Sequence, residues 1–161
     1  MQEQGPQLRN LNPEALTGQF EYRLDPKFRF TIPSRWFARM GFPTHVYVMH
    51  SLAGEPCLNV FAAVDFEKRM KPYENQQLSD ADTAKFLRTL AAKTELVAID
   101  AQNRVRVPDR MLRYAGLDGD IVMFGTGLHF EVWSAAKCPQ SPDDEVAEIK
   151  AFEQLAREVK F

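Results

Sequence analysis

The sequence has few of the residues that build metal centres or covalent active sites. Its two cysteines, Cys57 and Cys138, have no second Cys or His at the spacing of a metal site. The three histidines, His45, His50 and His129, also lack a regular ligand spacing. No glycine-rich phosphate loop, nucleophile motif or catalytic pair of carboxylates is convincing. We therefore expect no metal, no cofactor, no small-molecule substrate and no enzymatic activity.

Long apolar runs are also missing. No stretch reaches the roughly 18 consecutive apolar residues that a transmembrane helix needs. Residues 1–6 are polar and have neither the basic start nor the apolar run of a secretion signal. Unpaired thiols fit structural residues in a reducing compartment. These absences predict a cytoplasmic protein without a membrane partner. With 161 residues, 45% of them hydrophobic, the chain is long enough for one ordinary domain or two small subdomains.

An overall excess of positive charge is missing too, since the formal net charge is −2. That value argues against a nucleic-acid binder, because proteins that neutralise phosphates are usually basic. The cations are nevertheless concentrated in two segments, residues 23–39 and residues 100–113. They are Arg23, Lys27, Arg29, Arg35 and Arg39 in the first segment, and Arg104, Arg106, Arg110 and Arg113 in the second. Charge in these segments can act locally despite the overall sign.

The same two segments contain a sequence repeat. Residues 25–35 return as residues 100–110, displaced by 75 positions, with Asp, Arg, an aliphatic residue, Pro and Arg in matching places. Gly41 is matched by Gly116 at the same displacement. A shared displacement at so many separate positions indicates an internal duplication, which sets the architecture.

Each half of the chain predicts the same order of elements. Two short strands flank a charged turn, a short helix follows, and a pair of buried strands comes last. The expected N-cap of the short helix is Ser34 in the first half and Asp109 in the second. The expected strands cover residues 20–24, 30–32, 46–49 and 57–61 in the first half, and 96–99, 105–107, 121–124 and 129–133 in the second. Between the halves we expect a helix over 65–71 and another that begins at Ser79 or Asp80.

A last helix is predicted after Ser141, which is a good cap, with Pro142 at the first helical position. Its apolar residues recur every three to four positions: Val146, Ile149, Phe152, Leu155, Ala156 and Val159. This apolar face packs either on its own domain or against another copy of the chain.

The charged turns carry the candidate chemistry. Lys27 and Arg29 lie on or beside the first turn, and Gln102, Arg104 and Arg106 on or beside the second. An arginine can bind a phosphate or a guanine edge through two donors at once. Either these side chains bind an anion or nucleic acid, or they form a solvated surface with internal salt bridges. Residues expected to brace the motif are Asp25, Asp100, Arg35 and Arg110.

The doubled motif resembles the MraZ family, of the AbrB/SpoVT-like DNA-binding class. The family pattern is Asp-x-Lys-Gly-Arg followed by apolar-x-apolar-Pro, and residues 130–133 resemble its Phe-Glu-Leu-Trp segment. The resemblance implies an α+β fold in which two swapped-hairpin repeats form a pseudo-twofold, barrel-like core with peripheral helices. The parts expected are repeat 1 (17–64), a helical connector (65–92), repeat 2 (93–136) and a C-terminal helix (141–161).

The resemblance also implies the function. It predicts a sequence-specific, nucleoid-associated regulator, a repressor of the division and cell-wall gene cluster, which binds promoter direct repeats as a ring of identical subunits. Its contacts to double-stranded DNA would come from Lys27, Arg29, Gln102, Arg104 and Arg106. The alternative is an oligomeric interaction or scaffold protein that has lost DNA binding.

The motif glycine is replaced in both copies, by Phe28 and by Asn103. Asparagine tolerates left-handed backbone angles, whereas phenylalanine does so poorly. We therefore expect the second turn to keep the family shape and the first to be reshaped.

Overall fold

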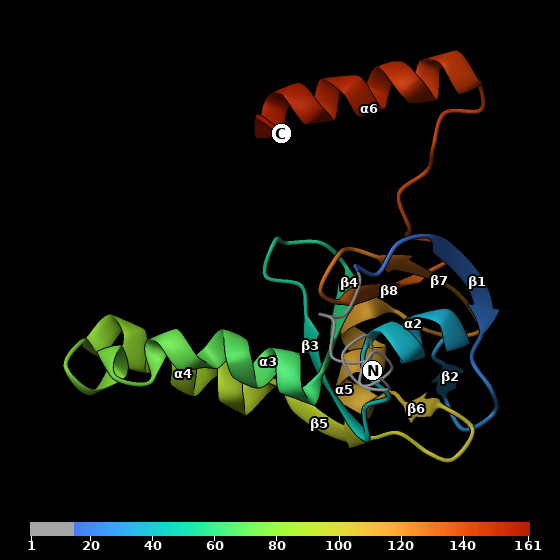
Figure 1. Ribbon diagram of the computed structural model, residues 1–161. Helices are drawn as coiled ribbons and strands as arrows, with labels where there is room; N and C mark the ends of the chain where they lie inside the picture. The colour runs from blue at the N-terminus through green and yellow to red at the C-terminus, as the bar shows by residue number, and fades with distance from the viewer. Residues whose placement is uncertain (1–14) are drawn as a thin grey trace, which may run out of the picture.

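Stretches rich in aromatic and β-branched residues form the strands of this protein, described here for residues 15–161 in a computed structural model (Figure 1). Six of them form one antiparallel sheet in the order β1-β7-β8-β4-β3-β5. They are β1 (Gln19–Arg23), β3 (His45–His50), β4 (Cys57–Ala62), β5 (Glu95–Ala98), β7 (Asp120–Gly125) and β8 (Phe130–Ser134). The short strands β2 (Arg29–Thr31) and β6 (Arg104–Arg106) form a second, two-stranded sheet. The predicted α+β class is confirmed.

The two halves of the chain are interleaved in the large sheet. Strand β1 comes from the first half and pairs with β7 of the second, with Tyr22 opposite Ile121. Strand β5 comes from the second half and pairs with β3 of the first, with Leu96 opposite Tyr47. Strands β4 and β8 join the halves at the centre of the sheet. The sheet ends in two edges, β1 and β5, and the strands described do not close into a barrel.

Five α-helices accompany the sheets in the described part of the chain. They are α2 (Ser34–Arg39), α3 (Ala63–Met70), α4 (Ala81–Lys93), α5 (Asp109–Ala115) and α6 (Glu145–Val159), with short 3-10 turns at Lys71–Tyr73 and Gln76–Leu78 between α3 and α4. Residues 1–6, whose polarity supported the expected location, lie outside the described residues. None of the helices found in residues 15–161 has the length and hydrophobicity to cross a membrane.

Several helix starts differ from the prediction. Ser34 and Asp109 are the first helical residues, because the prolines before them keep extended backbone angles and occupy the N-cap position. Helix α6 begins three residues later than expected. Its cap is Asp144, whose carboxylate accepts a hydrogen bond from the Ala147 amide at 3.1 Å. Of the two predicted caps of α4, Ser79 and Asp80, the structure has Asp80, whose side chain accepts from the Thr83 amide.

The core fixes the small β2–β6 sheet onto the large one. Phe30 of β2 meets Phe130 of β8 edge to face, with ring centroids 5.9 Å apart. Trp36 of α2 lies 5.2 Å from the same Phe130 ring, and its indole nitrogen donates to the Thr17 carbonyl at 2.7 Å. All three aromatic side chains are buried, and burying each stabilises the fold by about 1.5–3 kcal/mol. This packing holds the charged turns next to β2 and β6 in place.

Helices α3 and α4 form a hairpin that projects from the body of the protein (Figure 1). A smaller apolar cluster joins it to the sheet, centred on Met49, Phe61 and Phe66. Tyr47 of β3 stacks on Phe66 with ring centroids 4.4 Å apart. The hairpin thus has a hydrophobic contact of its own, separate from the main core.

Candidate nucleic-acid interface

The two charged turns precede the two strands of the small sheet. In the antiparallel β2–β6 pair, Arg29 lies opposite Arg106 and Thr31 opposite Arg104. Both turns lie beside this pair, at the end of the molecule opposite the α3–α4 hairpin (Figure 1). The pairing therefore brings two segments that are 75 residues apart in the sequence into one surface.

In the first turn, Asp25 binds the residues that follow it. Its Oδ1 atom accepts from the backbone amides of Lys27 and Arg29, each at 2.9 Å. Its Oδ2 atom accepts from the Nε of Arg29 at 2.6 Å. The amide of Phe28 donates to the Asp25 carbonyl at 2.9 Å. One carboxylate thus closes the turn and orients the arginine next to it.

The second turn repeats this arrangement bond for bond. Asp100 Oδ1 accepts from the amides of Gln102 and Arg104, each at 2.9 Å, and Oδ2 accepts from the Nε of Arg104 at 2.8 Å. The Asn103 amide donates to the Asp100 carbonyl at 3.0 Å. The duplication in the sequence is therefore also a duplication of local hydrogen bonding.

The hydrogen bonds determine the ionisation of both carboxyl groups. Burial alone raises the pKa of Asp25, but the hydrogen bonds from the Arg29 amide and guanidinium outweigh it and hold that pKa below its usual range. Burial likewise raises the pKa of Asp100, but the bonds from the Arg104 amide and guanidinium have the larger effect. The pKa of Asp100 therefore also lies below its usual range. Both carboxylates are charged at neutral pH and stay bound to their arginines.

The expectation that Phe28 reshapes the first turn is wrong. Phe28 has a φ of 59° and Asn103 a φ of 61°, so both residues adopt the left-handed conformation that the family glycine would adopt. The reason is that the bonds of Asp25 and the neighbouring strand determine the backbone path whichever residue occupies this position. The strain of a left-handed phenylalanine, about 1–2 kcal/mol, is borne by the surrounding hydrogen bonds.

Each turn is also bonded to the opposite repeat. The carbonyl of Phe28 accepts from the Val107 amide at 3.0 Å, and the carbonyl of Asn103 accepts from the Ile32 amide at 2.8 Å. Arg29 adds an ion pair to Asp100 across the repeats, with Nη1 and Oδ2 3.8 Å apart. Sequence reasoning expected a pseudo-twofold pair of repeats but did not identify these bonds, because a hydrogen bond between two distant segments leaves no local signal in the sequence. The matched displacement of whole motifs was the available signal that the two copies form a symmetric pair.

The candidate DNA-contacting side chains differ in exposure and in the partners they already have within the protein. Lys27 and Gln102 are exposed, and within residues 15–161 neither side chain is held by a hydrogen bond or an ion pair. Arg106 is exposed and pairs with Asp109 at 3.2 Å. Arg29 and Arg104 are half-buried, because each holds the aspartate of its own turn. Arg29 and Arg104 therefore stabilise their turns whether or not they also contact a ligand.

The two other arginines of the motif contact groups outside the turns. Arg35 lies over the Phe20 ring, with its guanidinium carbon 5.1 Å from the ring centroid. Arg110 pairs with Glu95 of β5 at 2.9 Å and donates to the carbonyl of Ala92 at 3.2 Å. The contacts of Arg110 connect α5 to β5 and to the end of α4.

The surface formed by the turns is only slightly basic. Its four cations, Lys27, Arg29, Arg104 and Arg106, face three carboxylates, Asp25, Asp100 and Asp109. The remaining donors suit phosphate oxygens and base edges. One copy of this surface offers few such contacts, so its affinity for DNA would be low and, because few phosphates are neutralised, only modestly dependent on salt.

Fold and site together define a duplicated α+β protein with a pair of matching basic turns. The family model for the MraZ protein matches residues 90–161. Over 150 residues, 91% of this chain and 99% of the relative, the chain is 31% identical to the transcriptional regulator MraZ of Mycoplasmopsis pulmonis. It is 28% identical over 142 residues to the transcriptional regulator MraZ of Kocuria rhizophila, covering 88% of this chain and 94% of the relative. The chain belongs to the MraZ family, and the resemblance drawn from the doubled motif is confirmed.

Proposed function

We propose that this protein is a DNA-binding transcriptional regulator that contacts double-stranded DNA through the two turns at residues 25–29 and 100–104. The observation that carries the proposal is the repetition of one hydrogen-bonded basic turn in a member of the MraZ family. Two related turns on one surface suit a duplex, whose phosphates and base edges recur at regular intervals. The proposal assigns no catalytic activity to the chain.

Within this proposal the candidate residues have different roles. Lys27, Gln102 and Arg106 contact DNA through exposed side chains. Arg29 and Arg104 also reach the DNA with their terminal nitrogens, while Nε holds Asp25 or Asp100 in the turn. Arg35 and Arg110 brace the motif indirectly, by fixing the helices that follow β2 and β6.

The fold detail belongs to the same proposal. Repeat 1 (17–64) and repeat 2 (93–136) act as swapped hairpins around a pseudo-twofold axis and give the core a barrel-like form, with the connector at 65–92 and the C-terminal helix at 141–161 outside it. The exchange of β1 and β5 between the halves supports this arrangement. So do the reciprocal bonds of Phe28 and Asn103.

The small number of free donors on each subunit supports action as an oligomer. A ring of subunits that engages short direct repeats together gains avidity without any new contact. We further propose that the regulator acts as a repressor at promoter repeats of the division and cell-wall gene cluster, in the cytoplasm at the nucleoid, as the resemblance of the doubled motif implies. The alternative function is that of a scaffold with the same fold that does not bind DNA. The nearly balanced charge of the turns favours this alternative.

Gel-shift titration separates the two functions. The probes are DNA from upstream of the chain's own coding sequence, where direct repeats are expected, and the same fragment with the repeats scrambled. The regulator binds the first probe at least ten-fold more tightly, and Lys27→Gln weakens that binding. Arg88→Gln, which removes an equal charge from the exposed surface of α4, leaves it unchanged. Equal binding of both probes, or none at low salt, supports the scaffold instead.

A further inference from the structure

Helix α6 presents an apolar face that no other element of residues 15–161 covers. Its large apolar side chains are all more than half exposed, and they are Val146, Ile149, Phe152, Leu155 and Val159. The helix lies clear of the sheets and of the other labelled helices (Figure 1). An amphipathic helix of 15 residues gains most of its stability from packing that face against a partner. The alternative that α6 packs on its own domain is therefore wrong for this structure.

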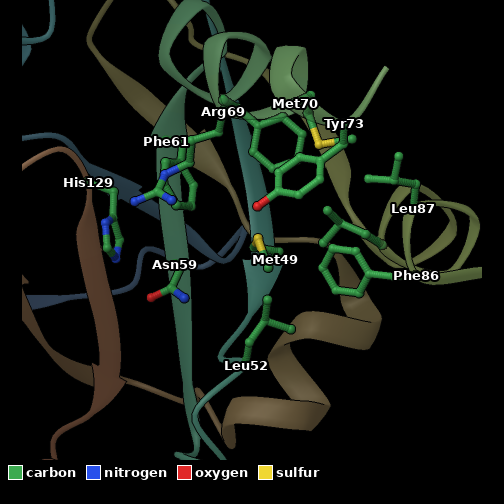
Figure 2. Close-up of a pocket in the computed structure, with 12 residues that line it drawn as sticks. Met49, Leu52, Asn59, Phe61, Arg69, Met70, Tyr73, Phe86, Leu87 and His129 are labelled. Carbon is green, nitrogen blue, oxygen red and sulfur yellow. The ribbon is translucent and has the colours of Figure 1, made fainter. Parts of the chain in front are cut away.

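The same chain contains an uncovered apolar groove, between α4 and strands β3 and β4. One part is a cavity of about 360 Å³, shown in Figure 2. A second part of about 180 Å³ continues from it and shares four lining residues, Met49, Leu52, Phe86 and Leu90. Leu52 and Phe86 are 61% and 46% exposed, which is unusual for residues that line an apolar cavity. The groove suits the apolar side chains of a helix, as in helix-in-groove recognition.

The charges of the helix and the groove are opposite. Among residues 15–161, Arg69 lines the first part of the groove and Lys93 the second, and no carboxylate of these residues lines either part. On α6, Glu145 and Glu148 precede Ile149 and Phe152 by four residues, so they lie on the apolar face near its first turns. The segment 143–160 as a whole has six carboxylates and three cations. A helix seated in the groove would place acidic side chains near the groove's cations.

The connection to α6 favours the groove of another molecule. Backbone amides of Lys137 and Cys138 both donate to the Ser134 carbonyl, at 3.0 and 2.9 Å, which anchors the chain directly after β8. Six residues, 139–144, remain before α6, and they span at most about 20 Å. Pro139 and Pro142 restrict their backbone. This short, stiff connection leads α6 away from the body that contains its own groove (Figure 1).

We propose that α6 of one copy docks into the α4–β3–β4 groove of a second copy, with Ile149 and Phe152 seated against Leu52 and Phe86. The inference rests on the proposed function only in taking the oligomer as the active form, and it names the interface. Because helix and groove are different surfaces, the contact is head to tail, and its repetition closes a ring if the rotation per subunit allows. The DNA-contacting turns are not part of this interface.

Sedimentation velocity on the full chain tests the proposal through two variants and two controls. Phe152→Glu places a charge on the helix face, and Phe86→Glu places one in the groove. Their controls are Gln154→Glu on another side of α6 and Arg88→Gln on another side of α4, each with the same change of net charge. Wild type and controls should sediment as oligomers. Both test variants should have a dissociation constant for self-association at least ten-fold higher than that of wild type. Circular dichroism checks that Phe86→Glu remains folded.

Mixing the two dissociated variants is the decisive step. One supplies an intact groove and the other an intact helix, so an equimolar mixture forms a dimer if docking is between molecules. A mixture that stays monomeric overturns the proposal, because the intact helix then does not enter the intact groove of another copy. Dissociation by Phe152→Glu alone also overturns it, in favour of contact between two α6 helices, as does a monomeric wild type. DNA binding at low salt is measured separately on wild type and on the dissociated variants. If none of these proteins binds DNA, that result contradicts the proposed function but not the docking of α6.

Discussion

The carbonyl oxygen of Phe28 accepts a hydrogen bond from the Val107 amide, so the turn of the first repeat is bonded to the residue that follows β6 of the second. The reciprocal bond joins Asn103 to Ile32. Neither turn can therefore move without disturbing the strand of the other repeat. This coupling explains how two replaced glycines still give two turns of one shape.

The cost of the left-handed residue at position 28 can be measured. Phe28→Ala keeps a side chain in the strained conformation, whereas Phe28→Gly removes that strain. We expect the glycine variant to have a free energy of unfolding about 1 kcal/mol higher than the alanine variant. Asn103→Gly and Asn103→Ala should show a difference of the same sign. Urea denaturation measures all four, and an alanine variant as stable as its glycine counterpart would contradict the strain at that turn.

The aromatic contact under the small sheet predicts a large loss of stability. Phe130 is fully buried between Phe30 and Trp36, so Phe130→Ala should lower the free energy of unfolding by about 3–5 kcal/mol. Leu78→Ala removes an apolar side chain that is 83% exposed and should change stability by less than about 0.5 kcal/mol. Similar losses for the two variants, from chemical denaturation, would show that Phe130 does not join the sheets.

Much of this fold could be predicted from the sequence, because strand alternation and the repeat are local or periodic signals. The strands around both turns were predicted in this way, and the preference of short polar side chains for helix caps limited the start of α4 to Ser79 or Asp80. The shape of the turn at Phe28 was not, since it depends on bonds from Asp25 and from Val107 of the other repeat. The groove at Leu52 and Phe86 also escaped prediction, because it forms only when α4 packs beside β3.

The two thiols should differ in reactivity. Cys57 is fully buried, and burial together with the nearby charges of Glu131 and Glu55 raises its pKa to about 12. Cys138 is partly exposed. At pH 8, iodoacetamide should modify Cys138 in the folded protein and leave Cys57 unmodified until urea unfolds the chain. Peptide mass spectrometry identifies the site, and equal labelling of both thiols in the folded protein would refute the burial of Cys57.

His129 predicts a dependence of stability on pH. Burial, and then the charge of Arg69, lowers the pKa of His129 below its ordinary value of 6.5. The unfolded chain therefore binds a proton more readily than the folded one, and stability is lost as the pH falls below about 6.5. His129→Gln should reduce this loss between pH 6.5 and 5, as measured by thermal unfolding. An unchanged pH profile in the variant would assign the effect to other groups.

The salt dependence of DNA binding tests the central claim most directly. For wild type, fluorescence anisotropy with upstream DNA should give an association constant that falls steeply with salt, with a slope of about 0.9 per phosphate contact in a log–log plot. The double variant Lys27→Gln/Arg106→Gln, which spares the aspartate-bound arginines, should bind more weakly with a clearly smaller slope, while Arg88→Gln should match wild type. No binding at low salt, or one slope shared by all three proteins, would contradict the assignment of DNA contact to these turns.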